Sequence, residues 1–225
     1  MNFRFKYFKH VEDRFPVTCI LALSALDFIL YFTAHNPFLL AFYFIAMIIP
    51  KAHICAWNHH HQHAPTFYKS SLNRLLEFFY ALHTGVTTNL WVLHHNYGHH
   101  QNYLDQSKDQ SRWQRKDGST MGELEYSLNI AATSYWRGYL VGRNYPAEQK
   151  TFMLFSAITF LVLAFLVWYK PIPAIFLFFL PMPMGLFITA WATFEHHSGL
   201  STDSPYEASF NNLNKWYNLF TGNLG

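Results

Sequence analysis

Residues 17 to 34 read Val-Thr-Cys-Ile-Leu-Ala-Leu-Ser-Ala-Leu-Asp-Phe-Ile-Leu-Tyr-Phe-Thr-Ala, with Asp27 as their only charged residue. A run of this length can cross the hydrocarbon core of a bilayer as one α-helix. The uncharged segment His35-Asn36-Pro37 predicts a tight turn, after which residues 38 to 57 run back with Lys51 near their end. The beginning of the chain therefore predicts a transmembrane hairpin.

A second pair of apolar runs occupies residues 152 to 169 and 173 to 194. Pro181 and Pro183 predict a kink in the last run, which membrane helices tolerate when neighbouring groups satisfy the freed carbonyls. The fold class that the sequence predicts is thus all-α. We expect residues 1 to 225 to form a single integral membrane domain with four transmembrane helices in two hairpins.

Basic residues gather on one side of these four crossings. They precede the first crossing and occupy the segment between the hairpins, whereas the two hairpin turns carry almost none. By the positive-inside bias, both termini and the middle segment are expected to face the cytoplasm, in a bacterial inner membrane or the endoplasmic reticulum. The basic residues concerned are Arg4, Lys6, Lys9, Arg14, Lys69, Arg74, Lys108, Arg112, Arg115 and Lys116.

The middle segment is expected to form a helical cap on the cytoplasmic side. Residues 72 to 93 are apolar but interrupted by Glu77 and other polar residues, which predicts helices lying along the membrane surface. Thr120 and Glu123 have the spacing of a capping box and predict a helix that runs to about Val141.

The composition excludes several classes of protein. The net charge of +3 is small and dispersed, so nothing in the sequence indicates nucleic-acid binding. Only two cysteines occur, Cys19 and Cys55, and they cannot supply a disulfide framework, an iron–sulfur cluster or a thiolate zinc site.

Histidine is concentrated in three places that all follow apolar stretches. Residues 59 to 63 read His-His-His-Gln-His, residues 94 to 100 read His-His-Asn-Tyr-Gly-His-His, and residues 195 to 197 read Glu-His-His. With four crossings, all three clusters emerge on the same side of the membrane. Since imidazole is the commonest metal ligand, this pattern predicts a metal centre held against the membrane.

The spacing within the clusters suggests how they bind metal. His59 and His63 are four residues apart, and share one face of a helix. His95 and His99 repeat that spacing, and His100 is expected about a quarter turn away, where it could reach a second metal ion.

Other classes of histidine site fit less well. No Glu follows the first histidine of the first cluster, so the zinc-protease signature with its general base is missing. The ligands of a bis-histidine haem would face each other within the bilayer, whereas these histidines cluster at the ends of the apolar runs. A metal transporter places its polar ligands near the membrane midplane, where these crossings hold almost none.

The clusters and their flanks resemble a known family. His59-x-x-x-His63 followed by Ala-Pro-Thr-Phe resembles the first histidine box of the membrane fatty acid desaturases, and residues 91 to 102 resemble their second box. Glu195-His196-His-Ser-Gly-Leu resembles an isolated motif of the membrane alkane hydroxylases, which are relatives of the desaturases. The similarity extends over roughly residues 20 to 225.

The resemblance implies a fatty-acyl desaturase in which two non-haem iron ions and O2 remove hydrogen from an unactivated C–H bond of a lipid. No catalytic residue beyond the metal centre is implied. The implied metal ligands are His59, His63, His95, His99, His100 and His196, and the candidates for supporting hydrogen bonds are His60, His61, Glu195 and His197.

Alternatives remain open on the sequence. A diiron hydroxylase of alkanes or other lipids would begin with the same hydrogen abstraction. The electrons would come from a separate ferredoxin, rubredoxin or cytochrome b5 type donor, because the chain has no redox module of its own. The basic stretch from Lys108 to Lys116 could dock an acidic carrier, or equally contact anionic lipid headgroups.

Two departures from the family's pattern stand out. Ala192 occupies the position, four residues before His196, where the isolated motif often has Asn. Residues 218 to 225 resemble the lead-in to a third His-x-x-His-His box, which this chain does not contain. We therefore expect a chain truncated at its C-terminus, with a catalytically inactive relative as the alternative.

Overall fold

The computed structural model describes residues 7–200, 202, 204 and 207–222, and within that part the regular secondary structure is helical apart from two isolated β-bridges. The helical elements in chain order are η1 (Val11–Asp13), α1 (Arg14–Thr33), α2 (Pro37–Ala46), α3 (Ile48–His63), α4 (Ser70–Thr84), η2 (Val92–His100), α5 (Glu123–Gly142), α6 (Pro146–Tyr169), α7 (Pro171–Ala174), η3 (Ile175–Phe179), α8 (Pro181–His197) and α9 (Lys215–Thr221). The prediction of an all-helical chain is confirmed for these residues.

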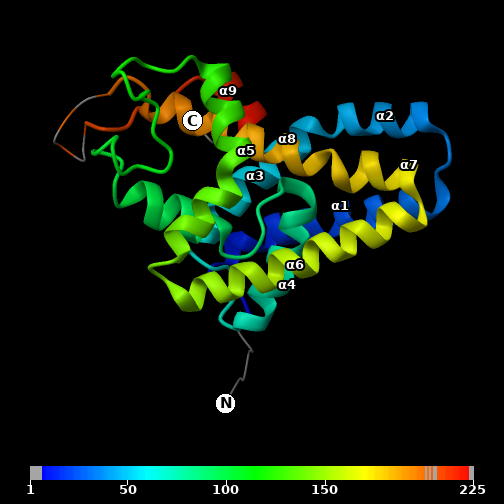
Figure 1. Cartoon of the computed structure of the whole chain (residues 1–225). Helices are drawn as coiled ribbons and strands as arrows, with labels where there is room; N and C mark the ends of the chain where they lie inside the picture. The colour runs from blue at the N-terminus through cyan, green and yellow to red at the C-terminus, as the bar shows by residue number, and fades with distance from the viewer. Residues whose placement is uncertain (1–6, 201, 203, 205–206, 223–225) are drawn as a thin grey trace.

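Three helical stretches are long and apolar enough to cross a membrane: Val11–Thr33, Pro146–Tyr169 and Pro171–His197. The pair α2 and α3 makes a fourth if the two helices form one bent span. In Figure 1, α1, α2, α6 and α7 project together as an elongated arm, and the other helices and the long loops gather at its opposite end.

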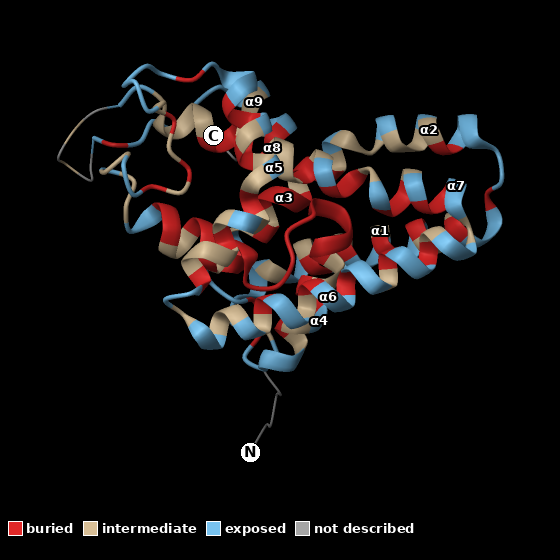
Figure 2. Ribbon diagram, in the orientation of Figure 1, coloured by how far each residue is buried: buried red, intermediate tan, exposed pale blue. Residues whose placement is uncertain are grey.

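The outer surface of this arm is apolar. Much of the ribbon of these helices is coloured as exposed in Figure 2. The exposed apolar side chains include Phe38 at 83%, Leu161 at 70% and Trp168 at 78%. A soluble protein rarely exposes large contiguous apolar patches. This surface is therefore suited to the hydrocarbon of a bilayer.

The second apolar run, predicted as one helix over residues 38 to 57, is broken near Met47 and bent by 51° between α2 and α3. Pro50 explains the break, because it has no N–H to donate to the carbonyl of Ala46, the last residue of α2. After the break α3 continues to His63, so the first histidine cluster lies in its last turn and not beyond it.

The kink expected at Pro181 takes the form of a π-helix. Leu180 N donates to the carbonyl of Ile175 over 2.8 Å, which is the i→i+5 bond that defines this wider turn. The π-helical turns of η3 end just before Pro181, and α8 then runs uninterrupted to the third histidine cluster.

The end of α4 and the segment that follows it lie inside the protein. The sequence instead predicts helices along the membrane surface for this part of the chain. Residues 81 to 90 are all buried, and α4 packs against α3 and α8. Glycine makes this possible, since a Cβ at Gly185 would lie 2.5 Å from Cα of Thr84. A Cβ at Gly85 would likewise lie 2.5 Å from the carbonyl oxygen of Met182. Gly85 also ends α4, with a φ of 71°.

The capping box at Thr120 is not formed. Thr120 instead forms an isolated bridge with Gln114, and its carbonyl accepts a hydrogen bond from Arg115. The helix α5 therefore begins at Glu123, with Gly122 as its N-cap residue.

Asp27, the charged residue of the first apolar run, is paired. Lys51 Nζ donates to Asp27 Oδ2 over 2.8 Å, and the hydroxyl of Tyr43 donates to Asp27 Oδ1 over 2.6 Å. His83 lies 3.1 Å from Lys51 Nζ through Nδ1 and 2.9 Å from Ser24 Oγ through Nε2. This buried pair between Asp27 and Lys51 joins α1 to α3.

Candidate metal centre

The first pair of histidines lies in the last turn of α3, on the side that faces η2. The ring centroids of His59 and His63 are 4.9 Å apart, as expected for residues one turn apart on a helix. His95 of η2 lies 4.6 Å from the ring of His59 and 5.3 Å from that of His63. The helix α3 thus presents both imidazoles to the second cluster.

The second cluster lies on a π-helix, and this changes which of its histidines share a face. In an α-helix, residues five apart point about 140° away from each other. In η2 the i→i+5 geometry stacks them, and Nε2 of His95 lies 2.9 Å from Nε2 of His100. His95 therefore lies near both His99 and His100, and His100 is not turned a quarter turn away as expected, because that expectation assumed an α-helix.

Four histidines from α3 and η2 form one compact group. His59, His63, His95 and His100 each offer a ring nitrogen, and these four atoms lie within 4.8 Å of one another. Two histidine nitrogens on opposite sides of one metal ion stand about 4.2 Å apart, since each bond is about 2.1 Å long. Small side-chain movements would bring the group to that geometry.

The electrostatics of the group also suit a metal ion. Burial lowers the pKa of His100 to about 4, and lowers the pKa of His95 well below its ordinary value. Both rings are therefore neutral near pH 7, with a lone pair to donate. Since a metal ion requires the deprotonated ligand, the donor set fits a divalent cation such as iron, zinc or copper.

His99 is not one of these four residues, although its ring centroid lies 5.3 Å from those of His95 and His100, and it is held by a carboxylate. Its Nδ1 donates to Asp109 Oδ1 over 2.8 Å, and the same oxygen accepts from Ser111 N over 2.7 Å. Its Nε2 is buried and has no hydrogen-bond partner among the described residues. The ring lies 4.8 Å from that of His197, so an unused ligand atom remains at a second position.

The third cluster lies at the end of α8 and is anchored by the chain that follows. Nδ1 of His196 donates to the carbonyl of Phe210 over 2.9 Å, and Nδ1 of His197 donates to the carbonyl of Ala208 over 2.8 Å. Each ring is thus fixed through one nitrogen while lining the same cavity.

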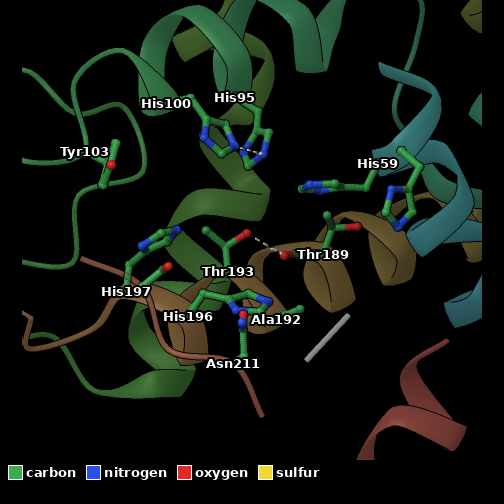
Figure 3. Close-up of a pocket in the computed structure, with 12 residues that line it drawn as sticks. His59, His95, His100, Tyr103, Thr189, Ala192, Thr193, His196, His197 and Asn211 are labelled. Carbon is green, nitrogen blue, oxygen red and sulfur yellow. Dashed lines mark hydrogen bonds between the residues drawn. The ribbon is translucent and has the colours of Figure 1, made fainter. Parts of the chain in front are cut away.

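One cavity of about 290 Å³ brings the clusters together. In Figure 3, His95 and His100 lie across it from His196 and His197, and His59 approaches from α3. The residues that line it are His59, His60, His95, His100, Tyr103, Thr189, Ala192, Thr193, His196, His197, Ser209 and Asn211.

The expected supporting residues are placed differently from one another. His60 lines the cavity beside His59. His61 faces away from it, since its Nδ1 accepts from Thr66 and its Nε2 donates to Glu77, an arrangement that fastens α3 to α4. Glu195 interacts with the hydroxyl of Tyr217. The carboxylate that hydrogen-bonds a histidine of this site is that of Asp109, which binds His99.

The cavity also contains residues that the sequence did not single out. Thr189 and Thr193 precede His196 by seven and three residues, so helical spacing alone could have placed them on its face, beside Ala192. Tyr103 and Asn211 lie outside the regular helices, and no periodicity in the sequence points to them.

The basic stretch between Lys108 and Lys116 is partly neutralised by its surroundings. Lys108 pairs with Asp105 at 2.8 Å, and Arg115 Nε donates to Glu125 over 2.9 Å. These exposed pairs reduce the positive potential available for an acidic carrier.

Comparison with known proteins gives one family. A family model described as fatty acid desaturase matches residues 22–225 of the chain. No curated protein and no solved structure matches it.

Proposed function

Because the chain belongs to the fatty acid desaturase family, we propose that it is an integral membrane enzyme that introduces a double bond into a lipid acyl chain. It would do so with a histidine-ligated pair of non-haem iron ions and O2. The observation that carries this proposal is the group of four histidines, His59, His63, His95 and His100, beside a cavity that contains a second, separately anchored set.

The two sets would hold one ion each. The group from α3 and η2 would bind the first ion, and His99, His196 and His197 would bind the second. When bound, the iron pair supplies activation of O2 and oxidation of an unactivated C–H bond. The second position has three of these histidines, one fewer than the first.

The protein's own contribution is to orient these ligands and to admit the substrate. Asp109 fixes the ring of His99 and its tautomer, as outer-shell carboxylates do in metal sites. Thr189, Ala192 and Thr193 present small side chains to the cavity from α8, which belongs to one of the apolar spans. An acyl chain would reach the metal position along this face.

The proposed topology has four crossings in two hairpins, with α2 and α3 together as the second crossing. Both termini and the metal site would then lie on the cytoplasmic side, in a bacterial inner membrane or the endoplasmic reticulum. The whole described chain would act as one domain.

An external carrier would supply the electrons. The chain contains two cysteines, Cys19 and Cys55, which is too few for a cluster of its own. A ferredoxin, rubredoxin or cytochrome b5 type protein fits the requirement for one-electron delivery.

A hydroxylase of alkanes or other lipids is the second candidate. The Glu195-His196-His197 motif at the end of α8 favours it. Both reactions begin by removing the same hydrogen atom, and the products separate them.

Lipid analysis of an expressing host tests the function. We expect new double bonds in the acyl chains, and iron in the purified protein that is lost in His59→Ala and His100→Ala. The control is His60→Ala, since His60 lines the cavity outside the four-histidine group. New hydroxyl groups would establish the hydroxylase, and unchanged lipids from an iron-containing protein supplied with a donor would exclude both reactions.

A further inference from the structure

Three cavities lie in series between the histidines and the loop surface. The metal cavity shares Tyr103 and His197 with a second cavity of about 80 Å³. The second shares Gln106 and Gln114 with a third cavity of about 290 Å³. The third cavity is also lined by Ser107, Arg112, Arg115, Lys116 and Gly118.

The wall of the second cavity combines apolar residues such as Leu104 and Leu200 with polar groups that hydrogen bonds hold in place. Gln106 Oε1 accepts from the backbone N–H groups of Trp113 at 2.9 Å and of Gln114 at 3.2 Å. The side-chain amide of Gln106 donates to the carbonyl of Tyr103 over 3.3 Å. A water molecule in the liquid occupies about 30 Å³, so this cavity of about 80 Å³ has room for about two to three, with polar partners in its wall.

The direction of this series differs from that of the apolar spans. In Figure 3, Tyr103 and His197 lie on the loop side of the metal cavity, whereas His59 and Thr189 lie on the opposite side. Thr189 belongs to α8, which is part of the apolar stretch Pro171–His197. The metal cavity thus lies between a polar loop region on one side and an apolar helical stretch on the other.

We propose that the three cavities form a water-filled passage that delivers protons to the metal cavity and lets water leave it. The proposal rests on the proposed function. The proposed desaturation converts an acyl CH2–CH2 unit to CH=CH. It consumes one O2, two electrons from the one-electron carrier and two protons, and it releases two water molecules. Tyr103 and His197 form the inner boundary of the passage, and Gln106 and Gln114 form the outer one.

Cysteine labelling tests whether the passage is hydrated, without any need for metal or activity. Ala208 lines the second cavity with 5% exposure, and Ala190 is buried on α8 at 1% outside the three cavities. With Cys19 and Cys55 replaced by alanine, a small charged methanethiosulfonate should label Ala208→Cys about tenfold or more faster than Ala190→Cys. A buried thiol reacts only through local opening. Thr202→Cys provides a second probe of the same cavity if Ala208→Cys does not fold, and equal slow labelling would overturn the proposal.

Filling the second cavity tests whether the passage is used. Ala208→Leu should retain its iron, lower kcat by about tenfold or more because proton delivery is obstructed, and increase the solvent deuterium isotope effect on kcat. Leu161→Phe adds similar bulk on the lipid-facing surface, and should change neither quantity. Unchanged kcat and isotope effect in Ala208→Leu would overturn the role of the passage. Absence of lipid oxidation by the unsubstituted protein would refute the proposed function, while the labelling result would still decide whether the passage is hydrated.

Discussion

Individual histidines in this chain have different tasks, although they look alike in the sequence. His61 directly follows two cavity-lining histidines, yet its Nδ1 binds Thr66 and its Nε2 binds Glu77. His99 stands beside His100, yet it is turned toward Asp109. The task of each ring follows from the partner of its second nitrogen, which a sequence does not show.

Asp109→Asn tests the carboxylate partner of His99. Asn keeps the shape but loses the charge that holds Nδ1–H, so metal affinity at the second position should fall by about 10- to 100-fold. Titration of the metal-free protein with Co²⁺, followed by its absorption spectrum, measures this. Asp105→Asn is the matched control, because Asp105 pairs with Lys108 on the surface. Equal Co²⁺ affinity in both variants would contradict the assignment.

Acid should destabilise the metal-free protein. Burial lowers the pKa of His83 well below its ordinary value of about 6.5, with Lys51 adding to the effect. Below pH 6.5 the unfolded chain binds a proton at this residue while the folded chain does not, so stability falls as the pH falls. The apparent midpoint of thermal unfolding should therefore drop between pH 7 and pH 5.

His83→Gln is the variant that isolates this contribution. Its midpoint should depend less steeply on pH, because the residue no longer titrates while hydrogen bonding to Ser24 is retained. The remaining slope has the same sign, since burial also lowers the pKa of His94, to about 3. A midpoint that rises toward pH 5 would refute the argument.

At the scale of elements, the apolar runs and their lengths predicted the helices well. The run from residue 17 became α1 and the run from residue 152 became α6, because length and hydropathy leave few other options in a membrane. The bend between α2 and α3 could also be predicted from Pro50, which lacks an N–H. The burial of residues 81 to 90 could not be predicted, since it depends on contacts made by glycines that are distant in the sequence.

The close contact of α4 with α8 makes a sharp prediction. Gly185→Ala places a Cβ against the backbone of Thr84, which cannot rotate away, so the protein should lose about 3 kcal/mol of stability or fail to fold. Gly122→Ala is the control, because a Cβ there meets nothing within 4 Å. Thermal unfolding in detergent compares the two, and an equal midpoint would show that the helices can separate at little cost.

At the scale of the whole molecule, the proposed four-crossing topology assigns the loops to defined sides of the membrane. The loop that carries Ser107 and the loop that carries Ser204 should lie on the same side of the membrane, and His35 on the other. Single cysteines at these positions, labelled in inverted vesicles by an impermeant reagent, test this. Labelling of all three from one side would refute the four-crossing topology.

The candidate site was foreseeable in its residues and less so in its geometry. Six of the histidines that the sequence singled out line one cavity, and that gathering follows from three clusters at the ends of apolar runs. Which histidines form the four-residue group was not foreseeable, because it depends on the wider turn of η2, and the hold on His99 depends on the loop residue Asp109.

The wide turn of η2 has a consequence for how such motifs are compared between proteins. A π-helical turn accommodates one residue more than an α-helical turn without displacing the residues on either side of it. Two relatives can therefore differ by a one-residue insertion between His95 and His100 and still superimpose their ligands. An alignment that opens a gap there, or a motif search with fixed spacing, would treat as a lost ligand what is only a change in the winding of the helix.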